Sequence, residues 1–134
     1  MAELVIGKEC RKTWDDLHNG TIGWTLWSMG EDFKHPTLDV LATGSKGFTE
    51  MKSYLTPSAC IFGGFRVRAI DVKRGIRSVR DRFVSFMYAG TETSTIKRAR
   101  FSGHKPKVFP LMSGVSASFE LVGTAPETFT MSRK

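Results

Sequence analysis

The chain has 134 residues, a length that fits one domain with a hydrophobic core. Its 20 lysines and arginines exceed its 13 aspartates and glutamates, and the net charge of +7 favours an acidic partner such as nucleic acid, anionic lipid or an acidic protein surface. No apolar run approaches the roughly 18 residues of a membrane-spanning helix, and the N-terminal segment lacks the pattern of a secretory signal. Cys10 and Cys60 are therefore expected to be free thiols in a reducing compartment.

The first half of the chain is predicted to contain two helices and two strands. Apolar residues three to four positions apart predict a helix over residues 3–18, which Asn19-Gly20 ends. Aromatic and alternating residues predict strands at 21–29 and 38–43. A short amphipathic helix is predicted between Phe48 and Leu55, ahead of Pro57.

A long antiparallel hairpin is predicted next. Residues 59–72 alternate apolar and basic side chains, residues 83–88 are apolar, and Lys73-Arg74-Gly75 supplies a turn. The pair Gly63-Gly64 predicts a bulge or bend in the first of these strands. The charged residues 78–82 are interpreted as a turn that leads into the second strand, which would hold basic side chains rigidly beside a buried strand.

The last third of the chain is predicted to hold two helical pieces and one strand. A basic helix over residues 91–100 would have Thr91, Thr93 or Ser94 as its N-cap. Residues 105–112 predict a further helical piece that Pro110 ends or distorts, and 116–122 predict the last strand. The tail, 123–134, is expected to be loosely ordered. This order of elements predicts an α/β (α+β) fold with one central sheet and helices on its faces.

Several blocks of sequence, taken in order, resemble one protein family. They are residues 9–17 with 22–27, residues 65–68, and residues 78–83 with 88–90 and 93–99. Together they extend from about Leu4 to Val122 and resemble the actin-depolymerising-factor homology (ADF/cofilin) domain family, and within it the coactosin-like branch. No single block is as specific as a metal-binding cysteine motif; the order of the blocks carries the resemblance.

The resemblance implies a single domain over residues 1–134, with a five- or six-stranded mixed sheet flanked by helices on both faces. It also implies a non-enzymatic actin-binding protein of the cytoplasm and cytoskeleton, without catalytic residues, cofactor or metal, that binds the sides of actin filaments. Carried over by position, the actin-binding residues are Arg80 and Arg82 at the start of a strand, and Lys97, Arg98 and Arg100 on the basic helix. We expect mostly a monomer, with self-association left open.

The sequence also departs from the family pattern. The tail after residue 122 is shorter than the family's last helix, Pro110 interrupts a helix that is usually continuous, and the serine-bearing N-terminal arm of cofilins is missing. The last departure favours filament binding over disassembly. Three alternatives remain open. They are cofilin-like binding of monomers with filament disassembly, single-stranded nucleic-acid binding through Arg66, Arg68, Phe83, Phe86 and Tyr88, and anionic lipid binding by residues 97–107.

Overall fold

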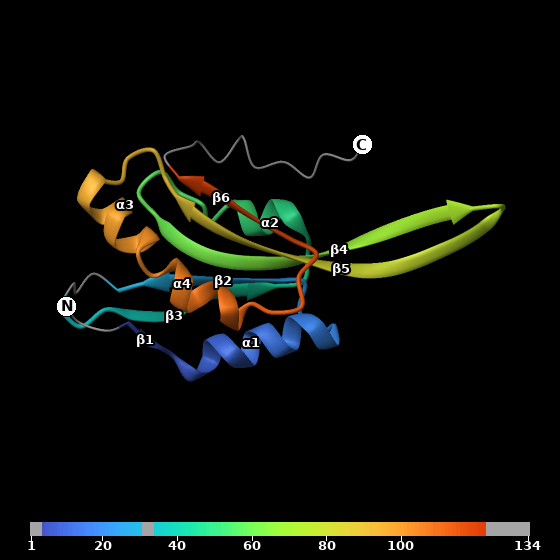
Figure 1. The fold of residues 1–134 in the computed structure, drawn as a ribbon, viewed down its shortest axis with the longest axis horizontal. Helices are drawn as coiled ribbons and strands as arrows, with labels where there is room; N and C mark the ends of the chain where they lie inside the picture. The colour runs from blue at the N-terminus through green and yellow to red at the C-terminus, as the bar shows by residue number, and fades with distance from the viewer. Residues whose placement is uncertain (1–3, 31–33, 123–134) are drawn as a thin grey trace.

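A computed structural model describes residues 4–30 and 34–122, which form a mixed six-stranded sheet with helices on both faces (Figure 1). The strands are β1 (Val5–Ile6), β2 (Trp24–Met29), β3 (Thr37–Gly44), β4 (Cys60–Lys73), β5 (Ile76–Ala89) and β6 (Ala117–Val122), in the spatial order β1-β3-β2-β4-β5-β6. The outer pairs β1/β3 and β5/β6 are parallel and the inner pairs antiparallel. The predicted fold class is thus confirmed, while the predicted loose tail lies outside the described residues.

The helices divide the core into two layers. They are α1 (Lys8–Asn19), α2 (Phe48–Lys52), α3 (Thr95–Ser102) and α4 (Lys105–Val108), followed by the 3₁₀ helix η1 (Phe109–Leu111). One layer joins α1, α3 and α4 to the sheet through Trp14, Phe62 and Phe101, and the other joins α2 to the opposite face through Met51 and Phe86. Because successive strand residues point to opposite faces, the neighbours Ile61 and Phe62 pack in different layers of the core.

The predicted first helix begins later than its apolar spacing indicates. Residues 5–6 form a strand instead, in which the amide of Val5 donates to the carbonyl oxygen of Pro36 at 2.9 Å. The amide of Gly7 donates to the carbonyl oxygen of Leu38 at 2.8 Å, and α1 starts only after this extended glycine. The prediction was wrong here because a sheet partner more than thirty positions away, which local spacing cannot reveal, fixes these residues.

The predicted hairpin is present and longer than expected. Strands β4 and β5 pair continuously from Cys60 opposite Ala89 to Lys73 opposite Ile76. Arg74 and Gly75 close it, both with positive φ values of 53° and 79°, as a two-residue type I′ turn requires. Strands β4 and β5 pair with the rest of the sheet only over the inner half of the hairpin. This pairing stops at Phe65 on β4 and starts at Val84 on β5, so the outer half projects as a two-stranded ribbon (Figure 1).

The glycine pair in β4 does not produce the predicted bulge. Register with both neighbouring strands is continuous through Gly63 and Gly64. A Cβ atom on Gly64 would lie 2.2 Å from Cζ3 of Trp14, and one on Gly63 would lie 2.7 Å from a side-chain carbon of Leu26. The glycines therefore make room for core side chains.

The C-terminal helices begin and end close to the predicted positions. Ser94 is the N-cap of α3, where its hydroxyl oxygen accepts from the amide of Lys97 at 3.1 Å. Pro110 falls where α4 has given way to the 3₁₀ helix η1, which confirms that it distorts the helical piece.

Candidate functional site

Arg80 and Arg82 lie in the middle of a strand, on the projecting ribbon. They were predicted to lie at the start of a strand, but β5 begins at Ile76 because the long partner β4 extends the pairing outward. Arg80 lies opposite Ala69 and Arg82 opposite Val67, so both arginines share the face on which Val67 packs against the α2 layer. Both side chains are exposed, and they form one row along that face.

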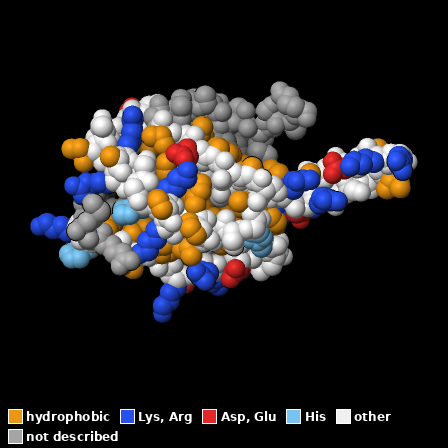
Figure 2. Space-filling model, in the orientation of Figure 1, with side chains coloured by type: hydrophobic (Ala, Val, Ile, Leu, Met, Phe, Trp, Pro, Cys, Tyr) orange, Lys and Arg blue, Asp and Glu red, His pale blue; other side chains and the backbone are white. Residues whose placement is uncertain are grey.

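The ribbon concentrates the positive charge of the molecule. Residues 67–82 contain six cations and two carboxylates, a net charge of +4 out of +7 for the whole chain. One carboxylate, that of Asp81, pairs with Arg68 at 3.4 Å. Asp81 and Arg68 occupy opposed positions on the other face from Arg80 and Arg82. Figure 2 shows basic side chains along the ribbon. The ribbon thus presents a dense basic surface away from the body of the protein.

The three predicted cations of α3 have different surroundings. Arg98 is partly buried, and its Nε donates to Oγ1 of Thr93 at 2.7 Å. Its guanidinium also donates to the carbonyl oxygen of Thr91 at 3.1 Å, so it holds the loop before α3 in place. Lys97 donates through Nζ to the carbonyl oxygen of Ser58 at 3.5 Å, and Arg100 is exposed.

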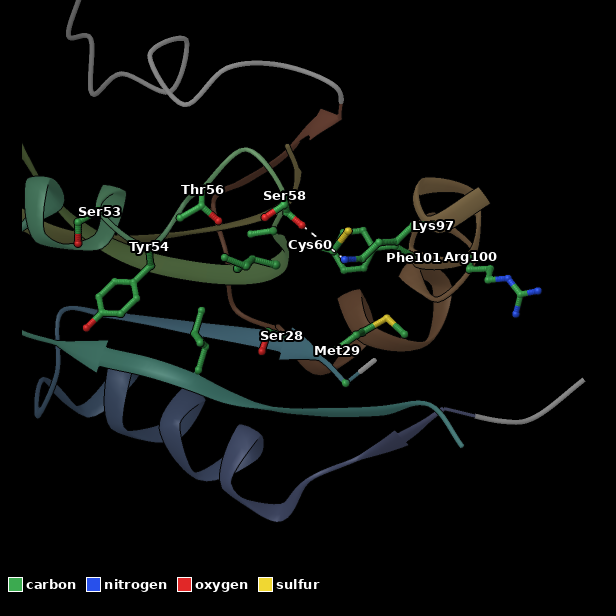
Figure 3. A pocket seen from close by; sticks show the side chains of 14 residues that line it. Ser28, Met29, Ser53, Tyr54, Thr56, Ser58, Cys60, Lys97, Arg100 and Phe101 are labelled. Atoms are coloured by element: carbon green, nitrogen blue, oxygen red, sulfur yellow. Dashed lines mark hydrogen bonds between the residues drawn. The ribbon is translucent and has the colours of Figure 1, made fainter. Parts of the chain in front are cut away.

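Lys97 and Arg100 line a cavity of about 370 Å³ beside α3 (Figure 3). Its apolar wall includes Met29, Tyr54 and Phe101. These cations lie far from the ribbon. The nine residue-to-residue steps from Arg80 to Ala89 span about 30 Å, and α3 follows beyond that end of β5 (Figure 1). The predicted site residues therefore form two separate groups at opposite ends of the molecule.

The aromatic residues considered for nucleic-acid stacking do not form an open platform. Phe86 and Tyr88 are both 0 % exposed. The ring of Phe83 lies 4.0 Å from the ring of His18, measured between centroids, and packs against the α1 layer. Because base stacking needs an accessible ring face, these residues do not support that alternative.

The reactive side chains of the described segments lack the arrangement of a catalytic centre. Burial, followed by the charge of Asp39, raises the pKa of the Cys10 thiol to about 12, so the thiol stays protonated. Within residues 4–30 and 34–122, no three His, Cys, Asp or Glu side chains gather where they could hold a metal ion. None of the helices in these segments is long and apolar enough to cross a membrane.

One feature of the ribbon was not predicted from the sequence. Its outer part exposes four aliphatic side chains, those of Ile70, Val72, Ile76 and Val79, among the basic ones. Ile70 and Val72 fell in the predicted strand 59–72, whereas Val79 fell in the stretch interpreted as a turn, so their common exposure was not expected. The signal that could have revealed them is the alternation of basic residues on both arms of the hairpin.

Comparison with known proteins agrees with this architecture. The family model described as cofilin/tropomyosin-type actin-binding protein matches residues 3–130. A crystal structure of human coactosin-like protein superposes with a TM-score of 0.80 and 17 % identity, over 96 % of this chain and 92 % of that one. Cofilin from Streptomyces griseoflavus gives a TM-score of 0.73 with 10 % identity, over 90 % of this chain and 86 % of that chain.

Coactosin from Entamoeba histolytica gives a TM-score of 0.68 with 22 % identity, over 90 % of this chain and 83 % of that chain. A search of the curated proteins found no match. The fold is that of the ADF-homology domains, seen in coactosin-like proteins and in cofilins. The chain belongs to the cofilin/tropomyosin-type actin-binding family.

Proposed function

We propose that this protein binds the sides of actin filaments, without catalysing a reaction, as a coactosin-type member of its family. Membership of an actin-binding family and the likeness to two coactosin structures support this assignment. The observation that carries the choice of surface is the net charge of +4 on the projecting ribbon, where Arg80 and Arg82 stand in one exposed row. The protein would act at the cytoskeleton, in the cytoplasm.

The chemistry of arginine suits this role. A guanidinium group forms two parallel hydrogen bonds with a carboxylate, and it costs less to desolvate than an ammonium group. An acidic filament surface would thus be held by Arg80 and Arg82. Exposed charges mainly raise the rate of association, so binding should weaken as salt rises.

The cations of α3 supply a second contact in this proposal. Lys97 and Arg100 are the candidates for direct contact, while Arg98 supports the helix from inside. About 30 Å of strand separates this group from the ribbon. In this proposal the two groups would therefore contact the filament at separate points.

Co-sedimentation with actin filaments at two salt concentrations tests the proposal. We expect the parent protein to pellet with filaments, less at high salt, without raising the amount of actin in the supernatant. The variant Arg80→Glu/Arg82→Glu should lose affinity about tenfold or more, because each reversed charge replaces attraction by repulsion. The control Lys8→Glu/Arg11→Glu changes two exposed cations of α1 by the same charge and should stay within about twofold.

Other results would point elsewhere. A rise of actin in the supernatant would favour the cofilin-like alternative of monomer binding and disassembly. A protein that stays in the supernatant at low salt would refute the actin assignment. Equal losses in the two charge-reversal variants would mean that net charge, and not the ribbon, determines binding.

A further inference from the structure

The end of the ribbon exposes aliphatic side chains to an unusual degree. Val72 and Ile76 flank the turn and are 67 % and 68 % exposed, and the opposed pair Ile70 and Val79 is 51 % exposed at each position. Exposed aliphatic side chains gathered in one place commonly mark a surface that binds something. In Figure 2 hydrophobic side chains lie at the far end of the ribbon, beside the basic ones.

These aliphatic side chains lie on both faces of the ribbon. Val72 shares a face with Ile70 and Val79, whereas Ile76, opposite Lys73, belongs to the other face. A protein surface that contacted one face would leave the apolar side chains of the other in water. A medium that surrounds the tip would cover both faces at once, and the boundary between lipid headgroups and acyl chains is such a medium.

Cations follow directly behind the aliphatic tip. Lys73, Arg74, Arg77 and Arg80 fall within eight residues, and no carboxylate occurs from Val72 to Arg80. Lys73 and Arg80 belong to one face of the ribbon and Arg77 to the other. This density of positive charge opposes docking of a second copy of the same tip and is complementary to anionic headgroups.

We propose that the tip of the β4–β5 hairpin inserts into the surface of an anionic bilayer. Val72 and Ile76 enter the boundary between headgroups and acyl chains, which lies about 5–10 Å deep for interfacial segments. Arg80, four residues along β5 from Ile76, then stands about 13 Å further out, at the level of the phosphate and carboxylate groups. The eight residues of β4 from Arg66 to Lys73 extend about 26 Å beyond the last residue paired with β2, which is more than this depth, so the folded sheet stays outside the membrane.

This proposal does not depend on actin binding. Arg80 takes part in both proposals, but the apolar tip residues Val72 and Ile76 take part only in membrane insertion, so their substitution separates the two. The membrane site also differs from residues 97–107, the basic segment that the sequence suggested for lipid binding, which lies at the opposite end of the molecule (Figure 1).

Co-sedimentation with vesicles tests the insertion. The two vesicle types are phosphatidylcholine alone and phosphatidylcholine with phosphatidylserine. We expect salt-sensitive binding to the second type and far weaker binding to the first. The variant Val72→Thr/Ile76→Thr keeps branched strand residues and removes apolar contact, so its affinity should fall about tenfold or more.

A matched control is available in the same chain. Val5 and Ile96 are 62 % and 66 % exposed, close to the values of Val72 and Ile76, and lie away from the ribbon. The variant Val5→Thr/Ile96→Thr should bind phosphatidylserine vesicles like the parent protein. The charge reversal Lys73→Glu/Arg77→Glu should abolish the preference for phosphatidylserine.

Three outcomes would overturn the proposal. In the first, the parent protein ignores phosphatidylserine vesicles at low salt. In the second, Val72→Thr/Ile76→Thr binds them as well as the parent, which would reduce the effect to surface charge without insertion. In the third, this tip variant loses actin binding while vesicles bind neither protein, which would assign the aliphatic tip to a protein partner. Loss of actin binding in Arg80→Glu/Arg82→Glu alone bears only on the function proposed above.

Discussion

The hydroxyl group of Thr13 joins helix α1 to the centre of the sheet. It donates to the carbonyl oxygen of Cys10 at 3.0 Å. Its oxygen accepts from Oγ1 of Thr25 at 3.0 Å and from Nε1 of Trp27 at 3.1 Å. Thr25 and Trp27 are both 0 % exposed, so their donor groups cannot bond to solvent water in place of the Thr13 oxygen.

Replacing Thr13 by valine should destabilise the protein although the shape of the side chain is kept. The change leaves the Trp27 N–H and the Thr25 hydroxyl without their acceptor, and a buried unsatisfied donor costs about 1–3 kcal/mol. Urea denaturation measures the loss in the free energy of unfolding. The same change at exposed Thr43 of β3 should stay within about 0.5 kcal/mol. Equal effects at the two positions would show that the buried hydroxyl contributes nothing.

Such contacts were beyond the sequence analysis, although their ingredients were visible in it. Apolar spacing placed Trp14 on the buried face of the first helix, and Trp14 is only 4 % exposed. Nothing local showed that its ring would cover Gly64, or that its indole N–H would donate to the carbonyl oxygen of Ser113 at 2.9 Å, 99 positions away. Side-chain partners of this kind depend on how the elements pack, which a single sequence does not encode in any short window.

Helix α3 shows why a row of basic residues cannot be interpreted from its charges alone. Its N-cap and its position were predicted from turn chemistry, and Ser94 is that cap. Arg98 was grouped with Lys97 and Arg100 because all three are cations in one helix. In the structure, Arg98 donates back to Thr93 and Thr91. Only the path of the loop before the helix, set by the end of β5, brings these acceptors within reach.

Substitution of Arg98 should therefore affect stability more than that of Arg100. Arg98→Ala removes hydrogen bonds from a charged donor and should lower the free energy of unfolding by about 1–3 kcal/mol. Arg100→Ala, on the exposed side of the same helix, should change it by about 0.5 kcal/mol or less. Thermal and urea unfolding of the two variants provide the comparison. An Arg98→Ala protein as stable as the parent would return Arg98 to the candidates for direct contact with actin.

The β4–β5 hairpin could be predicted as a motif but not in its length. Apolar alternation located its inner arms, and Lys73-Arg74-Gly75 located its turn. The stretch from Ser78 to Arg82 was interpreted as a turn because charged residues rarely fill a strand. Here they can, since residues 72–82 at the outer end of the hairpin are all exposed and have no core beneath them. The short β1 was missed for a related reason, because its partner Thr37–Leu38 is remote in sequence.

Viewed as one body, the protein carries two basic ends joined by a rigid sheet. The ribbon holds a net charge of +4, and Lys97 and Arg100 stand beyond the opposite end of β5. About 30 Å of strand between them is some three times the Debye length of about 8–10 Å at physiological salt. Charge changes at one end therefore have little direct electrostatic effect on the other.

This separation predicts additive effects on actin binding. Arg80→Glu/Arg82→Glu and Lys97→Glu/Arg100→Glu should each weaken binding to filaments, and the quadruple variant should lose the sum of the two free energies within about 0.5 kcal/mol. Sedimentation titrations of the four proteins, each first checked for unchanged unfolding, give the required affinities. If the quadruple variant lost no more binding free energy than the double variant that binds filaments more weakly, the two groups would act in one contact, contrary to their positions in the fold. If Lys97→Glu/Arg100→Glu had no effect on its own, the filament would be held by the ribbon alone, and the α3 contact would be withdrawn.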